Sequence, residues 1–328
     1  MKLFILFLLL SFNLSAKQVI RGAFDFGSGK IKIQVAVVDQ DTQKIVSTLL
    51  VKDIIVKLSE DAAHHPEGMF SEEIQQKALT AAKQLKEEAL QLGVEQFSGV
   101  ATEAYRKAPN GQDLIHRYLS ELNIPVRMIS QFDEGKLGFL ALINETGLDP
   151  TKVISWDIGG GSCQIAYFDN ESNFKVYMLP FGRETTKNAI IRYVKGQNPE
   201  FIRTPNPMTR VEWNAAINYF LRVMPGVPED LTKKLLLSDV QIVGISAHPE
   251  QLRSLKQYQI DHVEKILTGR LNKKDEQIDH KTPALAISEL ALVYSIMHKL
   301  QINDVSYIRT KSGSTSGLLS SKEYWLNY

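Results

Sequence analysis

Apolar and polar residues alternate most clearly near the start of the chain. Residues 19–26 read VIRGAFDF and residues 31–39 read IKIQVAVVD, and the alternation is clear in the second segment. Between them lies G-S-G-K, in which Gly27 and Gly29 can adopt the backbone angles of a tight turn. The pattern predicts a strand hairpin whose tip carries two glycines.

The rest of the first half mixes strand and helix patterns. Ser71, with two glutamates after it, is a typical helix cap, and apolar residues continue at helical spacing to Leu92. The other elements predicted here are a strand region at 47–58, a strand at 97–103, helices at 111–122 and 133–146, and a strand at 126–130 between those helices. This alternation favours an α/β fold.

The second half repeats the opening plan. V-I-S-W-D (153–157) reads as a strand, a glycine-rich turn follows, and the return strand includes I-A-Y-F (165–168). The other elements predicted for this half are helices at 209–223 and 283–300, a core strand within 235–244 and a solvated charged loop at 269–281. Two matched halves indicate two similar domains with a pseudo-twofold relation and a cleft between them.

Gly147 and Pro150 interrupt the pattern between the halves. We therefore place a first domain at residues 17–148 and a second at 149–328, and 328 residues suit two domains. Hydrophobic residues make up 44% of the chain and charged residues 23%, as in ordinary globular proteins. The formal net charge of +1 argues against a nucleic-acid binder with a strongly basic face.

Residues 1–16 differ from the rest of the chain. Lys2 precedes the apolar run L-F-I-L-F-L-L-L, and Ala16 is a small cleavage residue, which together are typical of a secretory signal. The run is shorter than the roughly 20 residues of a membrane-spanning helix. We expect export, to the periplasm, with no stable membrane span after cleavage; an uncleaved anchor is the alternative, because Leu14 is not small. With Cys163 as its one cysteine, the chain must be stable without an internal disulfide.

Two aspartates stand beside the two glycine tips. Glycines at a turn let backbone N–H groups point in one direction and form a pocket for anions, phosphate above all. Asp25 and Asp157 would repel such a ligand unless a cation bridged them, so a hard metal such as Mg²⁺ is implied. The alternative is that the glycines only allow tight turns, which is harder to sustain for two tips at equivalent places.

Four motifs carry a resemblance to a known family. D-F-G-S-G-K (25–30), A-T-E-A-Y-R-K-A (101–108), I-S-Q-F-D-E-G-K-L-G (129–138) and D-I-G-G-G-S (157–162) have the order and about the spacing seen in exopolyphosphatase/guanosine pentaphosphate phosphatases. The chain resembles this Ppx/GppA family over roughly residues 19 to 320. The resemblance implies two duplicated ribonuclease H-like domains of the actin-like ATPase superfold, with an interdomain cleft.

The resemblance also implies a role for each matching residue. Glu134 corresponds to the catalytic glutamate that activates the water attacking the terminal phosphoryl group; in the sequence alone, Asp133 beside it is equally eligible. Arg106 would contact phosphate, and Asp157 would help to hold Mg²⁺ or that water. The phosphate loops would comprise Asp25, Gly27 and Ser28 in the first domain and Gly159, Gly160, Gly161 and Ser162 in the second, with Asp25 and Asp157 as metal ligands.

Several positions depart from the family pattern. Gly29 and Lys30 stand where asparagine and a small hydroxyl residue are usual, and Gln164 stands where a glutamate is usual. Lys30 either adds a positive charge for phosphate or lies on the solvent face. The later segment G-I-S-A-H-P-E (244–250) is also altered, and His248 is a candidate phosphate or metal contact or else a turn residue.

These observations support three hypotheses. The first is a phosphohydrolase that releases terminal orthophosphate from polyphosphate or a phosphorylated guanine nucleotide, with Mg²⁺ as cofactor, no nucleic-acid partner and a homodimer as an open option. The second, motivated by Gln164, Gly29 and the altered segment 244–250, is a catalytically weakened binding protein of the same fold. The third is an ATP-dependent sugar kinase or chaperone-like ATPase, which export disfavours because ATP is scarce outside the cytoplasm.

Overall fold

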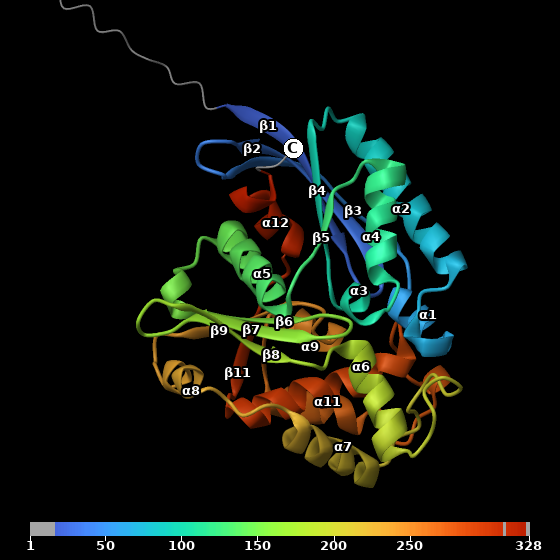
Figure 1. Ribbon diagram of the computed structural model, residues 1–328. Helices are drawn as coiled ribbons and strands as arrows, with labels where there is room; N and C mark the ends of the chain where they lie inside the picture. Colours follow the sequence, from blue (N-terminus) through green and yellow to red (C-terminus); the bar gives the residue numbers. More distant parts are fainter. Residues whose placement is uncertain (1–16, 311–312, 326–328) are drawn as a thin grey trace, which may run out of the picture.

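The computed structural model describes residues 17–310 and 313–325. The predicted signal segment, residues 1–16, lies outside this part of the chain. Within the described residues, no helix has the length and apolar character needed to cross a membrane. The described chain forms two α/β halves, each with one mixed sheet (Figure 1).

The first sheet has the strand order β3-β2-β1-β4-β5. Its strands are β1 (Gln18–Phe26), β2 (Lys30–Asp39), β3 (Ile45–Ile55), β4 (Gln96–Ala101) and β5 (Val126–Met128). The first three pair antiparallel, and β1, β4 and β5 run parallel. The helices of this half are α1 (Leu58–His64), α2 (Glu72–Leu90), α3 (Glu103–Lys107) and α4 (Gly111–Leu122). Side chains of β1 and β2 such as Phe24 and Ile33 join α2 and α4 in one buried core.

The second sheet repeats this topology with one further strand, in the order β10-β11-β9-β6-β7-β8. Its strands are β6 (Val153–Ile158), β7 (Cys163–Phe168), β8 (Phe174–Leu179), β9 (Gln241–Ser246), β10 (Gln257–Gln259) and β11 (Asp304–Tyr307). Its helices are α6 (Arg183–Ala189), followed by a π-helical turn (Ile190–Val194), α7 (Arg210–Val223), α8 (Glu229–Leu235), α9 (Glu250–Ser254), α10 (Ile260–Thr268) and α11 (Pro283–Leu300). Three antiparallel strands followed by parallel ones recur in both sheets, which confirms the predicted duplication.

Two helices lie between the sheets (Figure 1). Helix α5 (Gln131–Thr146) packs on β6, β7 and β8, while α12 (Ser314–Leu319) packs on β1 and β2, and the two helices contact each other extensively. At their crossing, a Cβ atom on Gly317 would overlap the Leu137 carbonyl, so glycine is required there. Helix α12, placed in the second domain from the sequence, therefore packs on the first sheet; the boundary at residue 148 stays a prediction.

Most of the predicted elements are present, with shifts that have local causes. The strand predicted at 47–58 ends at Ile55, because Leu58 begins α1. The strand predicted within 235–244 is β9, which begins at Gln241 and ends at Ser246, since the preceding apolar run belongs partly to α8. The loop at 269–281 is less solvated than predicted, because Arg270 and Ile278 are buried.

Candidate active site

The second glycine turn is fixed from behind by the first turn of α6. Three hydrogen bonds attach it: Arg183 N to Gly159 O (3.1 Å), Glu184 N to Gly160 O (2.7 Å) and Thr185 Oγ1 to Gly161 O (2.8 Å). In a trans peptide the N–H of the next residue points opposite to the carbonyl. The N–H groups of residues 160–162 are therefore directed away from α6, in the arrangement that an anion cradle needs.

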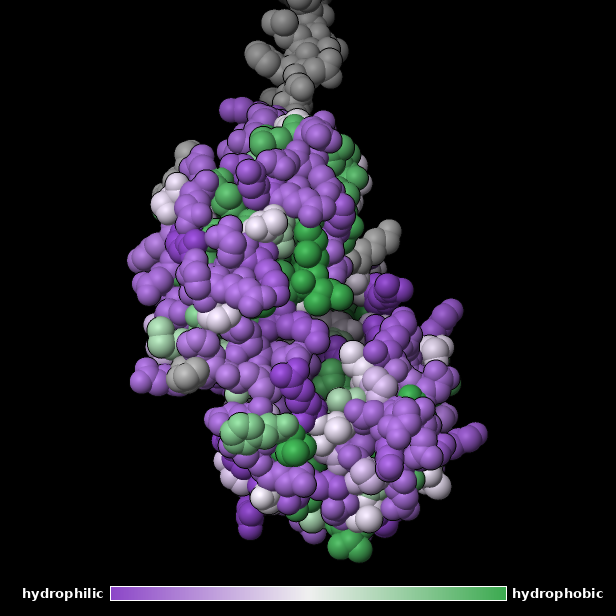
Figure 2. All heavy atoms as spheres, turned by 90° about the vertical axis from the view of Figure 1, so that its right-hand side faces the viewer, coloured by the Kyte–Doolittle hydropathy of each residue, from purple (hydrophilic) through white to green (hydrophobic). Residues whose placement is uncertain are grey.

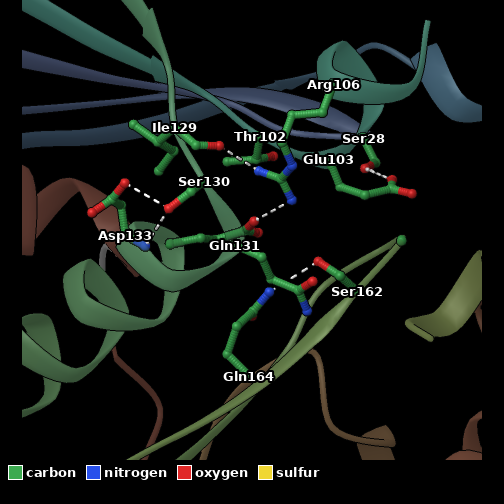
Figure 3. Close-up of polar contacts among 12 residues, drawn as sticks. Ser28, Thr102, Glu103, Arg106, Ile129, Ser130, Gln131, Asp133, Ser162 and Gln164 are labelled. Atoms are coloured by element: carbon green, nitrogen blue, oxygen red, sulfur yellow. Dashed lines mark hydrogen bonds and ion pairs between the residues drawn. The ribbon is translucent and has the colours of Figure 1, made fainter. Parts of the chain in front are cut away.

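The two glycine tips meet across the cleft. A Cβ atom on Gly160 would lie 3.0 Å from the Cβ of Ser28, and one on Gly161 would overlap the carboxylate of Glu103. Ser28 is buried, and its hydroxyl donates to Glu103 Oε2 at 3.3 Å (Figure 3). The first domain thus approaches the second turn so closely that a side chain at Gly160 or Gly161 would force Ser28 or Glu103 to move.

Helix α5 presents Glu134 to the cleft from its first turn. Ser130 caps the helix by accepting from Asp133 N at 3.1 Å, and the Gln131 side chain donates to two carbonyls of β7 and β8. The Asp133 carboxylate accepts from Ser130 Oγ at 2.6 Å and so belongs to the cap. Of the two adjacent acids, Glu134 is the one directed at Arg106, and a Cβ atom on Gly159 would lie 4.0 Å from Glu134 Oε1.

Arg106 joins the predicted base to the first domain. Its Nη2 lies 3.0 Å from Glu134 Oε2, and its Nη1 donates to Ile129 O at 2.7 Å (Figure 3). Burial raises the pKa of Glu134 to about 8; Arg106 opposes this shift, and the charges of Asp157 and Asp25 add to it. A carboxylate with a pKa near neutrality suits a general base.

Asp25 and Asp157 occupy equivalent places at the ends of β1 and β6, on the sheet faces that meet α12 and α5. Asp25 Oδ2 accepts from Ser314 Oγ of α12 at 2.5 Å, and a Cβ atom on Gly138 of α5 would lie 2.9 Å from Asp157 Oδ2. Burial raises the pKa of Asp157 to about 6; a hydrogen bond from Ser246 lowers it, and the charge of Asp25 raises it further. The two carboxylates therefore act on each other electrostatically across the cleft.

Comparison with protein families matches residues 36–282 to the Ppx/GppA phosphatase family. The chain belongs to this family. Among curated proteins it is 27% identical to exopolyphosphatase 1 of Mycobacterium leprae over 115 residues, 35% of this chain and 34% of the relative. It is 25% identical to exopolyphosphatase 1 of Mycobacterium bovis over 161 residues, 49% of this chain and 46% of that relative. The matched stretches thus span about a third to a half of these relatives.

Solved structures of Ppx/GppA proteins share the fold. The Aquifex aeolicus family member superposes with a TM-score of 0.70 at 19% identity, covering 95% of this chain and 100% of the other. An exopolyphosphatase from Cytophaga hutchinsonii gives a TM-score of 0.70 at 18% identity, covering 92% and 96%. The predicted fold of two duplicated, actin-like domains is confirmed, and so is the resemblance to the Ppx/GppA family.

One cation in this Ppx/GppA site escaped the sequence analysis. Lys32 pairs with Asp25 across β1 and β2, and its charge opposes the rise in the pKa of Asp157. A Cβ atom on Gly313 would lie 3.1 Å from Lys32 Nζ. The sequence did offer a sign of Lys32, because it lies between two isoleucines of the predicted hairpin, opposite Asp25. It offered none of the hydrogen bond from Ser314 to Asp25, because the two residues are 289 positions apart.

The carboxylate pair fits Mg²⁺ in a limited sense. Within residues 17–310 and 313–325, no cluster of three or more His, Cys, Asp or Glu side chains has metal-binding geometry. Mg²⁺ is usually held by one or two carboxylates together with water and substrate phosphates. Asp25 and Asp157, whose negative charges are close enough to raise the pKa of Asp157, therefore suit a cation that binds together with a phosphate chain.

Two of the altered positions serve structure. His248 is buried, with Nδ1 2.6 Å from Tyr258 Oη and Nε2 2.9 Å from Trp156 O, and burial lowers its pKa to about 4. It is therefore no phosphate or metal contact. Lys30 lies on the solvent face, half exposed and 3.4 Å from Asp53 Oδ2.

The cysteine and the glutamine of β7 are both buried. Cys163 Sγ accepts from Trp156 Nε1 at 3.1 Å, and burial raises the pKa of its thiol, as suits a core residue. Gln164 lies opposite Asp157 in the β6–β7 ladder and donates to Ser162 Oγ at 2.9 Å. The amide thus supports the serine of the second turn.

Beyond the tips, both domains line an open pocket of about 900 Å³. Helix α1 and Lys107 line it from the first domain, and α6, the π-helical turn and residues 199–201 line it from the second. Lys107 pairs with Glu103, and Thr185 is bonded to Gly161 O, so the inner end of the pocket adjoins the second turn. Figure 2 looks onto this side of the molecule, where a mostly hydrophilic surface is hollowed between the two lobes.

Proposed function

We propose that the protein is a phosphohydrolase of the Ppx/GppA type, which releases terminal orthophosphate from inorganic polyphosphate or guanosine pentaphosphate. The observation that carries this proposal is the partly buried Glu134–Arg106 pair beside the second glycine turn. It combines a carboxylate of raised pKa, a guanidinium and inward-facing backbone N–H groups in one cleft. Membership of the phosphatase family supports the same reaction class.

Each side chain has a task in this reaction. Glu134 accepts a proton from water, whose oxygen forms a bond to the terminal phosphorus as the bridging P–O bond breaks and the shortened chain leaves as an anion. Arg106 and the N–H groups of residues 160–162 bind the phosphoryl oxygens, where negative charge must be neutralised. Asp25 and Asp157 would hold Mg²⁺, which would supply further neutralisation of the phosphate charges.

Replacing Glu134 by glutamine tests the base. The amide keeps the size of the side chain but accepts no proton, so orthophosphate release from tripolyphosphate with Mg²⁺ should fall by about 10²- to 10⁴-fold. Binding of tripolyphosphate, measured by calorimetry, should persist. The matched control is Asp133→Asn, because Asp133 is adjacent but bonded to Ser130. Wild-type turnover in Glu134→Gln would remove Glu134 from the mechanism.

A second candidate function is phosphate-chain binding with little catalysis. It is favoured by Gln164, whose neutral amide lies opposite Asp157 and donates to Ser162 rather than adding a third carboxylate. The same assay separates the two functions. Calorimetric binding without any release of orthophosphate by the wild-type protein would establish the binder, and Gln164→Glu would then be expected to restore some turnover.

We also propose that the protein is exported and works in the periplasm. The support is the pattern of residues 1–16, with Lys2, an apolar run and Ala16. Amino-terminal sequencing of protein recovered from the periplasmic fraction tests this, with cleavage after Ala16 as the expected result. Full-length protein confined to the membrane fraction would instead establish the uncleaved anchor.

A further inference from the structure

An ion pair between a partly exposed arginine and a buried glutamate lies behind the second glycine turn. Arg183, the first residue of α6, crosses to α11, where its Nε donates to Glu289 Oε1 at 2.6 Å and its Nη2 lies 2.5 Å from the same oxygen. Glu289 is the one carboxylate of α11, and its side chain is only 3% exposed. Its neighbours Ile287 and Leu290 are part of the apolar core of the second domain.

Other basic groups face the same carboxylate. Glu289 Oε2 lies 3.6 Å from His280 Nε2, and the buried Arg270, which donates to Ala286 O at 2.6 Å, interacts electrostatically with Glu289. Burying such charges carries a desolvation penalty that their attraction often fails to exceed, so a buried ion pair is weak evidence for stability. Fixing one particular register of two packed elements is a better-supported role for buried polar contacts.

The Arg183–Glu289 pair fixes the position of α6, and α6 is the helix that holds the second glycine turn. Arg183 takes part twice: its backbone N–H donates to Gly159 O, and its side chain binds Glu289. Gly182, just before it, abuts the turn so closely that a Cβ atom would lie 2.6 Å from Gly159 O and from Ser162 N. A shift of the α6 N-terminus therefore shifts the backbone of the turn.

We propose that Arg183 and Glu289 are positioning residues that act as a clamp: they hold the first turn of α6 against α11 and so keep the N–H groups of residues 160–162 directed into the cleft. Neither side chain touches the phosphate chain. The inference rests on the proposed function, because it assigns these N–H groups to the phosphoryl oxygens. Loosening the clamp would weaken phosphate binding and turnover through the turn.

The test compares Glu289→Gln and Arg183→Gln with a matched control. Arg183→Gln is the more tolerant change, since Glu289 keeps His280 and Arg270 as partners. The control is Glu264→Gln, which breaks the exposed Arg210–Glu264 pair (3.1 Å) elsewhere in the second domain. The measurements are amide hydrogen exchange of Arg183 and Glu184, calorimetric binding of inorganic tripolyphosphate, and kcat/KM for its hydrolysis.

Both clamp variants should speed exchange of the two amides at least tenfold and lower both tripolyphosphate affinity and kcat/KM by about 10- to 10²-fold, the scale of a 1 Å misplacement. Glu264→Gln should change none of these. Exchange at the wild-type rate, or faster exchange with affinity and kcat/KM unchanged, would overturn the clamp. The exchange measurement needs no ligand, so it tests the contact between α6 and the turn by itself. If the wild-type protein neither binds nor hydrolyses tripolyphosphate, the proposed function fails, and the clamp's role toward phosphate fails with it.

Discussion

Gly182→Ala is a sharp test of how the second glycine turn is held. The backbone of Gly182 is extended, with φ −125° and ψ −164°, so alanine meets no conformational obstacle there. The obstacle is space: the new Cβ would lie 2.6 Å from Gly159 O, 2.6 Å from Ser162 N and 2.7 Å from Gly160 C. All three are backbone atoms of the turn, so no flexible side chain can move aside.

The size of the effect follows from these distances. Ordinary contact begins at 3.4 Å, so the turn or the start of α6 must move by about 0.8 Å. Overpacking of this kind typically costs about 1–3 kcal/mol of stability. A displacement approaching 1 Å in the proposed phosphate cradle should lower kcat/KM by about 10²-fold.

Two assays measure these effects separately: urea unfolding gives the free energy of unfolding, and orthophosphate release from tripolyphosphate gives kcat/KM. Gly226→Ala is the matched control, because no described atom beyond its chain neighbours lies within 4 Å of the added Cβ. The control should keep wild-type activity. Wild-type stability and kcat/KM in Gly182→Ala would refute the contact between α6 and the turn.

Three further predictions concern charge in the cleft. The pKa of Glu134 is raised to about 8 and the base must be unprotonated, so kcat/KM should rise as the pH passes through about 8. Arg106→Gln should move this rise to higher pH, because Arg106 lowers the pKa of Glu134. A rise of the wild-type kcat/KM near pH 4.5 would contradict the prediction. Chelation of Mg²⁺ by EDTA should abolish orthophosphate release and added Mg²⁺ should restore it, so undiminished release in EDTA would exclude the metal role of Asp25 and Asp157. Lys32→Met should raise the pKa of Asp157 and lower kcat/KM by about 10-fold, because the cation that favours the charged form of this carboxylate is lost, whereas unchanged kinetics would show that Lys32 is dispensable.

The parts of the site that are local in sequence were predictable. The hairpin tips follow from alternation and glycine spacing, and the helix predicted at 133–146 is α5, which begins two residues earlier because Ser130, predicted to end a strand, caps it. A strand end, a tight turn and a helix cap each depend on a few neighbouring residues. These local rules brought Asp25, Glu134 and Asp157 to the correct ends of their elements.

The parts that depend on distant contacts were not predictable. Strand β8 and helix α6, which hold the second turn, carry short and mixed patterns, and the sequence gives no sign that Gly182 abuts Gly159. For His248, the sequence suggested a functional contact that the structure does not contain. Its position beside an altered loop suggested chemistry, but its ring points inward and both nitrogens are satisfied in the core.

The glycines of the second turn show why a motif alone cannot establish a phosphate site. Gly160 and Gly161 are favoured by the approach of Ser28 and Glu103, whether or not any ligand binds between the domains. The feature that favours phosphate is instead the direction of the backbone N–H groups of residues 160–162. Because α6 takes up the carbonyls of residues 159–161, the N–H groups are turned to the opposite side, and a turn needed only for packing has no reason to be tied in this way. A glycine motif of the same composition without a helix behind it would therefore be weaker evidence for an anion site than the one in this chain.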